Sequence, residues 1–316
     1  MTSINTIVFG PTGHVASAAA QFAQAKGMKV FLAMRDVQKE IPGFTSQQEK
    51  EAGFERVYAD LTKPETVLAV VRKTKAKRAF LYLIFGAPMN PSIEALKAGG
   101  VDFVVFLSSS SVVGDLHSIP QKDFIAWQHA RVEIAIREAF DSENYIMVRP
   151  GYFNTNTLGW KASIRKGKFE LIYSAALFDF ISPGDIGRVC GALLVEGPQH
   201  LETKAGRNVV KLLGPHAMSQ RDAAEIVGKA IGKEFEIVEL DDEQGVRFYI
   251  EEIGAPEPGA KSLVRDLKAR AEGGISATGY VGPIYEEAIG NIQKYTGRQP
   301  TNFSTWVEEN KAAYVD

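Results

Sequence analysis

The sequence predicts an α/β fold in which a doubly wound parallel sheet carries a smaller, mainly helical and discontinuous cap. Three observations support this prediction. Short, continuously apolar runs of β type alternate with helical patterns through the first half of the chain. A glycine turn, Gly10-x-x-Gly13-x-x-Ala16, joins the first apolar run to the first helical pattern. After Arg149-Pro150 the alternation stops, and the sequence becomes loop-rich and then mainly helical.

The first half of the chain has the alternation expected of βαβ units. Candidate strands cover residues 6–10, 29–35, 54–60, 79–85, 102–109 and 145–150. Candidate helices cover residues 15–27, 63–74, 92–100 and 124–140, with apolar spacing near 3.6. The candidate strands are apolar without interruption, which is typical of strands that are buried on both faces of a parallel sheet.

The second half supplies the last core elements and the cap. Residues 182–197 predict a helix and 208–214 one more strand, whereas 151–172 are loop-rich and aromatic. We expect a core of residues 1–153 and 184–214, and a substrate-binding cap of residues 154–183 and 215–316. The stretch 254–283, rich in glycine and proline, is either a lid or a surface connector.

The composition excludes several classes of protein. The chain has 316 residues, of which 45% are hydrophobic and 23% charged, as in ordinary globular proteins. The formal net charge of −2 and the lack of a long lysine or arginine run argue against nucleic acid as a partner. Cys190 is the single cysteine, so an intrachain disulfide cannot form. Apolar stretches are too short to cross a bilayer, and we expect a cytoplasmic protein without a membrane partner.

The glycine turn has the spacing of a phosphate-binding loop. Gly10 permits a tight turn at the end of the strand, and Gly13 lets the backbone approach a diphosphate. Ala16 only has to let the helix lie close to the strand, so alanine is sufficient there. The N-terminus of the following helix offers N–H groups and partial positive charge to an anion. The loop therefore predicts a bound dinucleotide.

Two basic residues at the end of the second strand indicate which dinucleotide. NAD-binding proteins usually place a carboxylate there, against the ribose 2′-hydroxyl. This chain has Arg35 at that point and Lys39 one helical turn later. A guanidinium suits a 2′-phosphate, which favours NADP(H). Asp36 is an adjacent carboxylate that could serve the ribose instead.

With these features, the chain resembles the NmrA-like family of atypical short-chain dehydrogenases/reductases, which have a Rossmann fold. The motifs that carry the resemblance are YADLTKPETV, YIMVRPGYFNTN, FISPGDIGRV, LLGPHAMSQRDAAEIVGKAIGK and YTGRQPTNFSTWVEENKAAY. The loop and the resemblance together imply these cofactor contacts: Gly10, Thr12, Gly13, His14, Val15, Arg35, Lys39, Asp60, Leu61, Phe85, Gly86, Ser108, Ser109, Pro150, Tyr152 and Phe153. The family contains both reductases and proteins that sense the cofactor without turnover, so the fold does not decide the function.

The helix at 124–140 departs from the pattern that the resemblance implies. Members of the wider superfamily use a Tyr-x-x-x-Lys pair on this helix, and the matching positions here are Ile125 and His129. An alternative register would pair Trp127 with Arg131, neither of which is a normal proton donor. Isoleucine cannot donate a proton. His129 is a candidate general acid, with a ribose-contacting or surface histidine as the alternative. Tyr152 is the other candidate donor, with an aromatic wall as its alternative.

The expected substrate pocket is mostly apolar. Its candidate residues are Met89, Ser110, Trp127, Asn154, Asn156 and Trp160. Further lining could come from Phe153, Leu158, Phe178, Phe180, Phe248, Tyr249 and Tyr280, although each of these is as often a core residue. Such a lining favours a hydrophobic, ring-containing small molecule. The chain shows no His, Cys or carboxylate cluster with metal-ligand spacing, so we expect no metal.

Three functions remain open at this point. The first is an NADPH-dependent oxidoreductase that transfers a hydride to a hydrophobic carbonyl, imine or conjugated acceptor. The second is an NAD(P)-sensing regulator that binds a protein partner without turnover. The third is an isomerase or cyclase that reuses the fold without a redox step.

Overall fold

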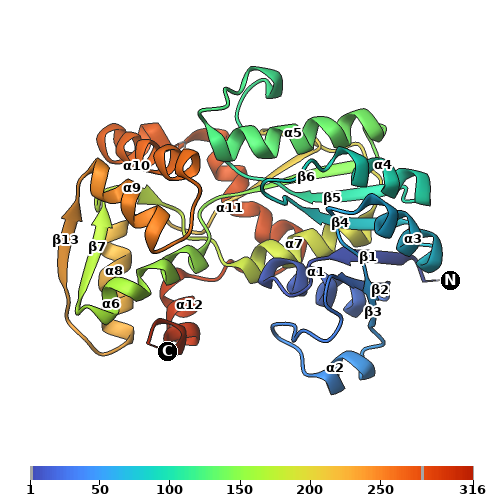
Figure 1. Ribbon diagram of the computed structural model, residues 1–316, viewed down its shortest axis with the longest axis horizontal. Coiled ribbons are helices and arrows are strands. Elements are labelled where there is room, and N and C mark those ends of the chain that lie inside the picture. The colour runs from blue at the N-terminus through green and yellow to red at the C-terminus, as the bar shows by residue number, and fades with distance from the viewer. Residues whose placement is uncertain (1–2, 279–280, 316) are drawn as a thin grey trace.

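The computed structural model describes residues 3–278 and 281–315, and within them a seven-stranded parallel sheet forms the centre of the larger lobe (Figure 1). The strand order is β11-β6-β5-β4-β1-β2-β3, with all neighbours parallel. The strands are β1 (Asn5–Phe9), β2 (Lys29–Met34), β3 (Glu55–Tyr58), β4 (Arg78–Tyr82), β5 (Phe103–Leu107), β6 (Tyr145–Pro150) and β11 (Val209–Leu212). The order reverses between β1 and β4, which confirms the predicted doubly wound α/β fold.

Helices cover both faces of this sheet. One face packs against α3 (Pro64–Thr74), α4 (Asn90–Gly99) and α5 (Phe124–Ala139). The other packs against α1 (His14–Ala25), α7 (Pro183–Glu196) and α11 (Gly282–Thr296). Helix α11 falls in the range 215–316 expected for the cap, but it lies against α7 and β11 of the core. The short α2 (Ser46–Glu51), which the sequence analysis did not predict, precedes β3.

The smaller lobe, on the left in Figure 1, contains most of the expected cap and has a hydrophobic core of its own. It contains two small sheets that the sequence analysis missed. In one, β7 (Lys168–Ile172) pairs in parallel with β13 (Glu236–Leu240); in the other, β8 (Leu177–Phe178) pairs with β12 (Met218–Ser219). Charged residues flank the short apolar runs of β7 and β13, so these strands lack the continuous apolar signal of the core strands.

The helices of this lobe surround the small sheets. They are α6 (Lys161–Arg165), α8 (Gln220–Ala230), α9 (Asp242–Glu251), α10 (Glu257–Thr278) and α12 (Phe303–Asn310), with 3₁₀ turns η2 (Asn154–Trp160) and η3 (Lys311–Tyr314). The remaining elements are η1 (Leu116–Ser118) and a small hairpin of β9 (Glu202–Thr203) and β10 (Gly206–Arg207). Most of the stretch 254–283, expected as a lid or connector, is therefore helix α10. In the part of the chain that the structure describes, helices of membrane-spanning length and hydropathy are absent.

Helices α1 and α7 pack at unusually close range because α7 presents glycine to α1. A Cβ added at Gly187 would overlap the Val15 carbonyl oxygen and lie 2.6 Å from the Ala18 Cβ. A Cβ at Gly191 would lie 2.7 Å from the Ala19 carbonyl oxygen. The backbones can approach this closely only without side chains on α7. Since α1 begins at the phosphate loop, this packing also positions the loop.

We predict that Gly187→Ala lowers the free energy of unfolding by about 1–3 kcal/mol, the usual cost of overpacking. The matched control is Gly290→Ala in α11, where an added Cβ meets nothing within 4 Å. This control should gain about 0.5–1 kcal/mol, because alanine is the better helix former. Urea denaturation of both variants measures the difference. Equal stability of the two would contradict the close packing of α1 on α7.

Candidate functional site

The phosphate loop has the geometry that the sequence predicts. Gly10 has φ of +69°, and a Cβ there would overlap the ring of Tyr82 on β4. Gly10 N–H donates to the Ala33 carbonyl oxygen at 3.0 Å, which fixes the turn to β2. A Cβ at Gly13 would meet only the Gly10 carbonyl oxygen, at 3.5 Å, so space remains in front of this residue. Glycine at position 10 is therefore required by its protein neighbours, and at position 13 the free space suits a ligand.

The N-terminus of α1 is arranged to receive an anion. Its N-cap is Gly13, which has no side chain, and among the described residues a side-chain acceptor for the first-turn N–H groups is absent. Thr12 is half-buried, whereas His14 is exposed and the Val15 side chain is buried, so the contacts expected of Val15 fall to its backbone. Ala16 is buried beneath the loop, as its role in close packing requires.

A cavity of about 380 Å³ lies beside this loop at the carboxyl ends of β1, β2, β3 and β4. It brings together six of the expected cofactor residues: Gly10, Thr12, Arg35, Lys39, Asp60 and Leu61. The sequence analysis missed Tyr82, which lines the same cavity and whose ring packs against Gly10. Its signal was available, because an aromatic residue at the end of the strand next to a glycine loop is placed to contact that loop.

The charged residues of this cavity divide into paired and unpaired groups. Burial by itself would raise the pKa of Asp60. Hydrogen bonds from Thr62 and the charge of Arg35 lower it by more than burial raises it, so the pKa lies below its ordinary value. Asp36 Oδ1 accepts the Gln38 N–H at 2.9 Å and is thereby used in a turn. Arg35 and Lys39 are exposed, and neither has a carboxylate partner at ion-pair distance among the described residues.

His129 lies on α5 beneath aromatic rings. Its Nδ1 is 2.8 Å from the Ile125 carbonyl oxygen, which can only accept, so the proton is on Nδ1. The ring of Phe85 lies 6.1 Å away, and that of Phe106 lies 6.4 Å away. Burial lowers the pKa of His129, against smaller opposing effects of the Ile125 hydrogen bond and the Glu133 charge. A neutral ring in this tautomer offers Nε2 as a hydrogen-bond acceptor, not as a proton donor.

A buried ion pair anchors α5 to the sheet. Glu133 is fully buried and accepts from Arg149 Nε at 2.8 Å and from an Arg149 terminal nitrogen at 2.6 Å. The other terminal nitrogen of Arg149 donates to the Val112 carbonyl oxygen at 3.0 Å. Ser108 Oγ donates to Glu133 Oε1 at 2.6 Å. The buried Ser108 hydroxyl is thus held by this carboxylate, and the cofactor contact expected of Ser108 stays a prediction.

The next three serines, at positions 109–111, make no hydrogen bond to Glu133 among the described residues. Ser109 and Ser111 hydroxyls lie 2.8 Å apart, and both residues are at least partly exposed. Ser110 N–H donates to the Pro150 carbonyl oxygen at 2.9 Å, which joins the ends of β5 and β6. The cofactor contact expected of Ser109 stays a prediction. Gly86 has φ of +77°, and Phe85 is 56% exposed above His129.

Tyr152 faces the aromatic core of the cap. Its ring lies 4.1 Å from that of Phe178 and 5.5 Å from that of Phe180. Burial raises the pKa of Tyr152, and the charge of Arg270 opposes this only in part. The phenol therefore keeps its proton at neutral pH. Phe153 is half-buried beside it and forms an isolated bridge to Ile181.

The residues expected to form the substrate pocket lie in different surroundings within the described part of the chain. Met89 is 2% exposed, and its sulfur accepts the Ile84 N–H, so it belongs to the core. Trp160 packs edge-on against Phe169 inside the cap. Asn154 is fully buried with both amide atoms unpartnered among the described residues, whereas Asn156 is exposed. Met89 and Trp160 therefore lie in hydrophobic cores, and the substrate contacts expected of them stay predictions.

The expected apolar lining is also largely used elsewhere. Phe178 and Phe180 are core residues of the cap, and Leu158, Phe248 and Tyr249 pack against the same hydrophobic core. Trp127 is half-buried under the Arg131 guanidinium, 4.7 Å from its ring centroid. Tyr280 lies outside the described residues.

A cavity of about 790 Å³ lies between the β5–α5 connection, β11 and α10, and it includes Ser110. Its lining is more polar than the sequence analysis predicts, since Lys211, Asp266 and Arg270 all contribute to it. Burial lowers the pKa of Lys211 and raises that of Asp266. Groups of three or more His, Cys, Asp or Glu that could hold a metal are absent from residues 3–278 and 281–315.

Comparison with known proteins adds to this picture. A family model described as "NmrA-like family" matches residues 3–276. The nitrogen metabolite regulation-like protein bik4 of Gibberella fujikuroi is 34% identical over 330 residues, covering 98% of this chain and 97% of that protein. Festuclavine dehydrogenase easG of Aspergillus fumigatus is 25% identical over 244 residues, covering 74% of this chain and 75% of that protein.

A solved structure shares the same fold. The NADPH-dependent quinone oxidoreductase QOR2 of Escherichia coli superposes with a TM-score of 0.67 at 17% identity, covering 97% of this chain and 99% of that one. The likeness at this identity shows the fold alone.

The lowered pKa of His129 predicts a specific dependence of stability on pH. The unfolded chain protonates this histidine near ~6.5, whereas the folded protein does so only at lower pH. The unfolded state therefore binds more protons in this window, and stability falls as the pH is lowered through it. We predict that His129→Gln flattens the loss of unfolding free energy between about pH 7.5 and 5.5. Urea denaturation across this range measures both slopes, and identical slopes would contradict a lowered pKa of His129.

Proposed function

Because the chain belongs to the NmrA-like family, we propose that it is an NADPH-dependent oxidoreductase acting on a small-molecule carbonyl, imine or conjugated acceptor. The observation that carries this proposal is the cofactor cradle. A glycine turn shaped by Tyr82, an open α1 N-terminus and unpaired Arg35 and Lys39 surround one cavity. These features suit a dinucleotide diphosphate and a 2′-phosphate.

The residues of this chain would divide the binding work by charge. The α1 N-terminus would hold the diphosphate, and Arg35 and Lys39 the 2′-phosphate. A bound NADPH supplies the hydride. His129, neutral and with Nε2 free to accept, would hold a ribose hydroxyl and so orient the cofactor. This assignment uses the position of the usual lysine without requiring a charge there.

Tyr152 is the better candidate for returning a proton to the reduced acceptor. It is protonated at neutral pH, and it lies directly after β6 at the junction of the core and the cap. His129 in the tautomer described has no second proton to give at Nε2. Water is the remaining source, and it would be sufficient for a reactive acceptor, because a positioned acid contributes only about 10²–10⁴-fold.

A second candidate function is a cofactor sensor that binds a protein partner without turnover. The observation that favours it is Ile125, which occupies the position of the usual proton donor and cannot transfer a proton. The name of the relative that is 34% identical also refers to regulation. This alternative predicts that the protein distinguishes NADP⁺ from NADPH while catalysing nothing.

We predict NADPH oxidation above background with at least one class among quinones, enones, aldehydes and imines, followed by absorbance at fixed cofactor concentration. Tyr152→Phe should lower the rate of the chemical step by about 10²-fold while cofactor affinity stays within twofold. Background rates across the whole panel, together with a calorimetric preference for one redox state of the cofactor, would instead establish the sensor.

The cofactor assignment has its own test. Arg35→Glu should weaken NADPH binding by about 10–100-fold, because one charge-assisted hydrogen bond is lost and a repulsive charge is gained. NADH binding should change much less. Arg72→Glu, an exposed position on α3, makes the same change in net charge away from the cavity and serves as the control. Titration calorimetry with both cofactors gives the four affinities, and equal losses for NADPH and NADH would contradict the assignment.

A further inference from the structure

We propose that Arg56 on β3 is a positioning residue for cofactor choice: it holds the turn that presents Lys39 to the 2′-phosphate of NADP(H). This inference rests on the proposed function, and it adds a residue that neither motif nor position in the sequence singles out. Arg56 itself is not part of the cavity lining. Its effect would come through the backbone of the turn, in a region where specificity between the two dinucleotides is decided.

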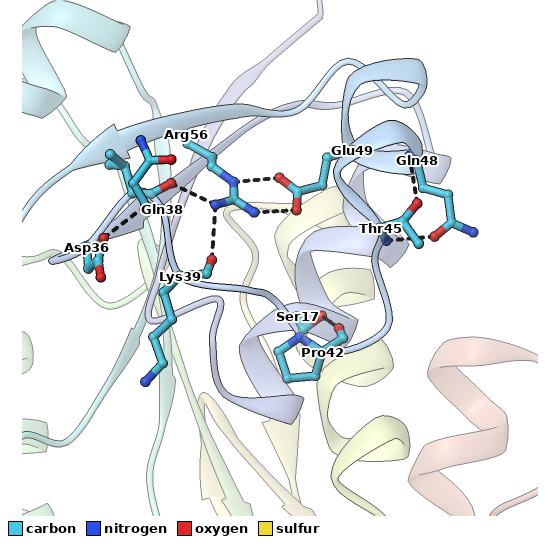
Figure 2. A network of polar contacts seen from close by, with 10 residues as sticks. Ser17, Asp36, Gln38, Lys39, Pro42, Thr45, Gln48, Glu49 and Arg56 are labelled. Atoms are coloured by element: carbon cyan, nitrogen blue, oxygen red, sulfur yellow. Dashed lines mark hydrogen bonds and ion pairs between the residues drawn. The ribbon is translucent and has the colours of Figure 1, made fainter.

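The contacts of Arg56 span the whole turn. Its Nε and one terminal nitrogen donate to the two carboxylate oxygens of Glu49 on α2, at 2.7 and 2.6 Å. Its other terminal nitrogen donates to the carbonyl oxygens of Val37 and Lys39, at 2.7 and 3.0 Å. Figure 2 shows the guanidinium between the turn and α2, with the Lys39 side chain leaving the turn on the side away from Glu49.

The turn at residues 36–39 also has hydrogen bonds of its own, and Arg56 joins the turn so formed to β3 and α2. Asp36 Oδ1 accepts the Gln38 N–H at 2.9 Å, and the Lys39 N–H donates to the Asp36 carbonyl oxygen at 3.3 Å. Farther along, Ser17 of α1 donates its hydroxyl to the Pro42 carbonyl oxygen (Figure 2). The segment after β2 is thus tied to β3 and to the phosphate-binding helix. An exposed loop would otherwise have to be ordered when the cofactor binds.

The charges indicate that Arg56 acts by position. Its guanidinium is matched by the Glu49 carboxylate, whose side chain is 7% exposed, so the pair adds little net field at the cavity. The Glu49 hydrogen bond raises the pKa of Arg56, and the guanidinium stays charged. Lys39 and Arg35, by contrast, are exposed and lack carboxylate partners among the described residues. Arg56, which is paired with Glu49, would therefore support the turn, and the unpaired Lys39 and Arg35 would bind the 2′-phosphate.

The capping of α2 supports the Glu49 end of these contacts. Thr45 accepts the Gln48 N–H at 3.2 Å, and the Gln48 side chain accepts the Thr45 N–H at 2.8 Å, which forms a capping box. This box begins the helix that carries Glu49. The carboxylate that receives Arg56 is therefore itself held in place, as a positioning contact requires.

The experiment compares two nucleotides that differ only in the 2′-phosphate, adenosine 2′,5′-bisphosphate and adenosine 5′-monophosphate. Titration calorimetry on the full chain gives the ratio of their affinities. Arg56→Met should lower affinity for the bisphosphate by about tenfold, on the scale of one charge-assisted hydrogen bond. Affinity for the monophosphate should change less than about twofold. Arg207→Met, which breaks an exposed Arg–Glu pair in the β9–β10 hairpin, is the matched control and should leave both unchanged.

A double-mutant cycle separates positioning from general stability. Lys39→Met alone should lower the ratio of affinities, and in the Arg56→Met background the same change should lower it by clearly less, because Lys39 is then already misplaced. Arg56→Lys keeps the charge but cannot bond Glu49 and both carbonyl groups at once, so it should reduce the ratio in the same direction. This variant and Glu49→Gln provide the comparison if Arg56→Met does not fold.

The outcomes distinguish this inference from the proposed function. A wild-type protein with no preference for the bisphosphate would overturn the assignment of NADP(H) itself. A clear wild-type preference that Arg56→Met leaves unchanged, or equal losses for both nucleotides, would overturn the role of Arg56 alone. Additive effects of Arg56→Met and Lys39→Met on the ratio would also overturn it, since they would show that the arginine does not act through Lys39.

Discussion

The buried ion pair between Glu133 of α5 and Arg149 of β6 is the interaction on which the rest of the site depends. The Glu133 carboxylate accepts two hydrogen bonds from Arg149 and one from Ser108, and these three bonds connect α5 to the ends of β5 and β6. Removal of one partner from such a pair leaves an uncompensated charge and costs about 3–5 kcal/mol. The pair thereby sets the height and rotation of α5, and with them the place of His129 one turn earlier.

A second carboxylate connects the core to the cap. Asp179 is buried and accepts the N–H groups of Tyr152 and Gly214, both at 3.0 Å. Glycine is needed at positions 151 and 214, because a Cβ at either would overlap Asp179. The turn after β6 is thus bound from both lobes, and Tyr152 is held between them. The two buried carboxylates thus hold the two segments that carry His129 and Tyr152.

The site that results differs in chemistry from the usual arrangement of the superfamily. Ile125 and His129 stand at the positions where the superfamily pattern has tyrosine and lysine, so under the proposed function cofactor orientation and proton supply would fall to different elements. At the other end of the cofactor cradle the cations are exposed and the support is buried, since Arg56 pairs with Glu49 while Lys39 stays free of carboxylates within the described residues. Under the proposed function, binding specificity and reactivity would therefore depend on separate parts of the fold.

Local patterns in the sequence determined the core strands and helices, the phosphate loop and the basic residues after β2, because each depends on residues near one another in the chain. Tertiary structure alone decided which of the predicted side chains line a cavity and which are buried in a hydrophobic core. Ser108 turned to Glu133, Met89 and Trp160 entered hydrophobic cores, and α11 packed on the sheet. The strands β7 and β13 could be recognised only from their pairing in the folded protein, and not from their sequence patterns. Partners distant in sequence decide this burial and hydrogen bonding, and a short window of sequence does not contain them.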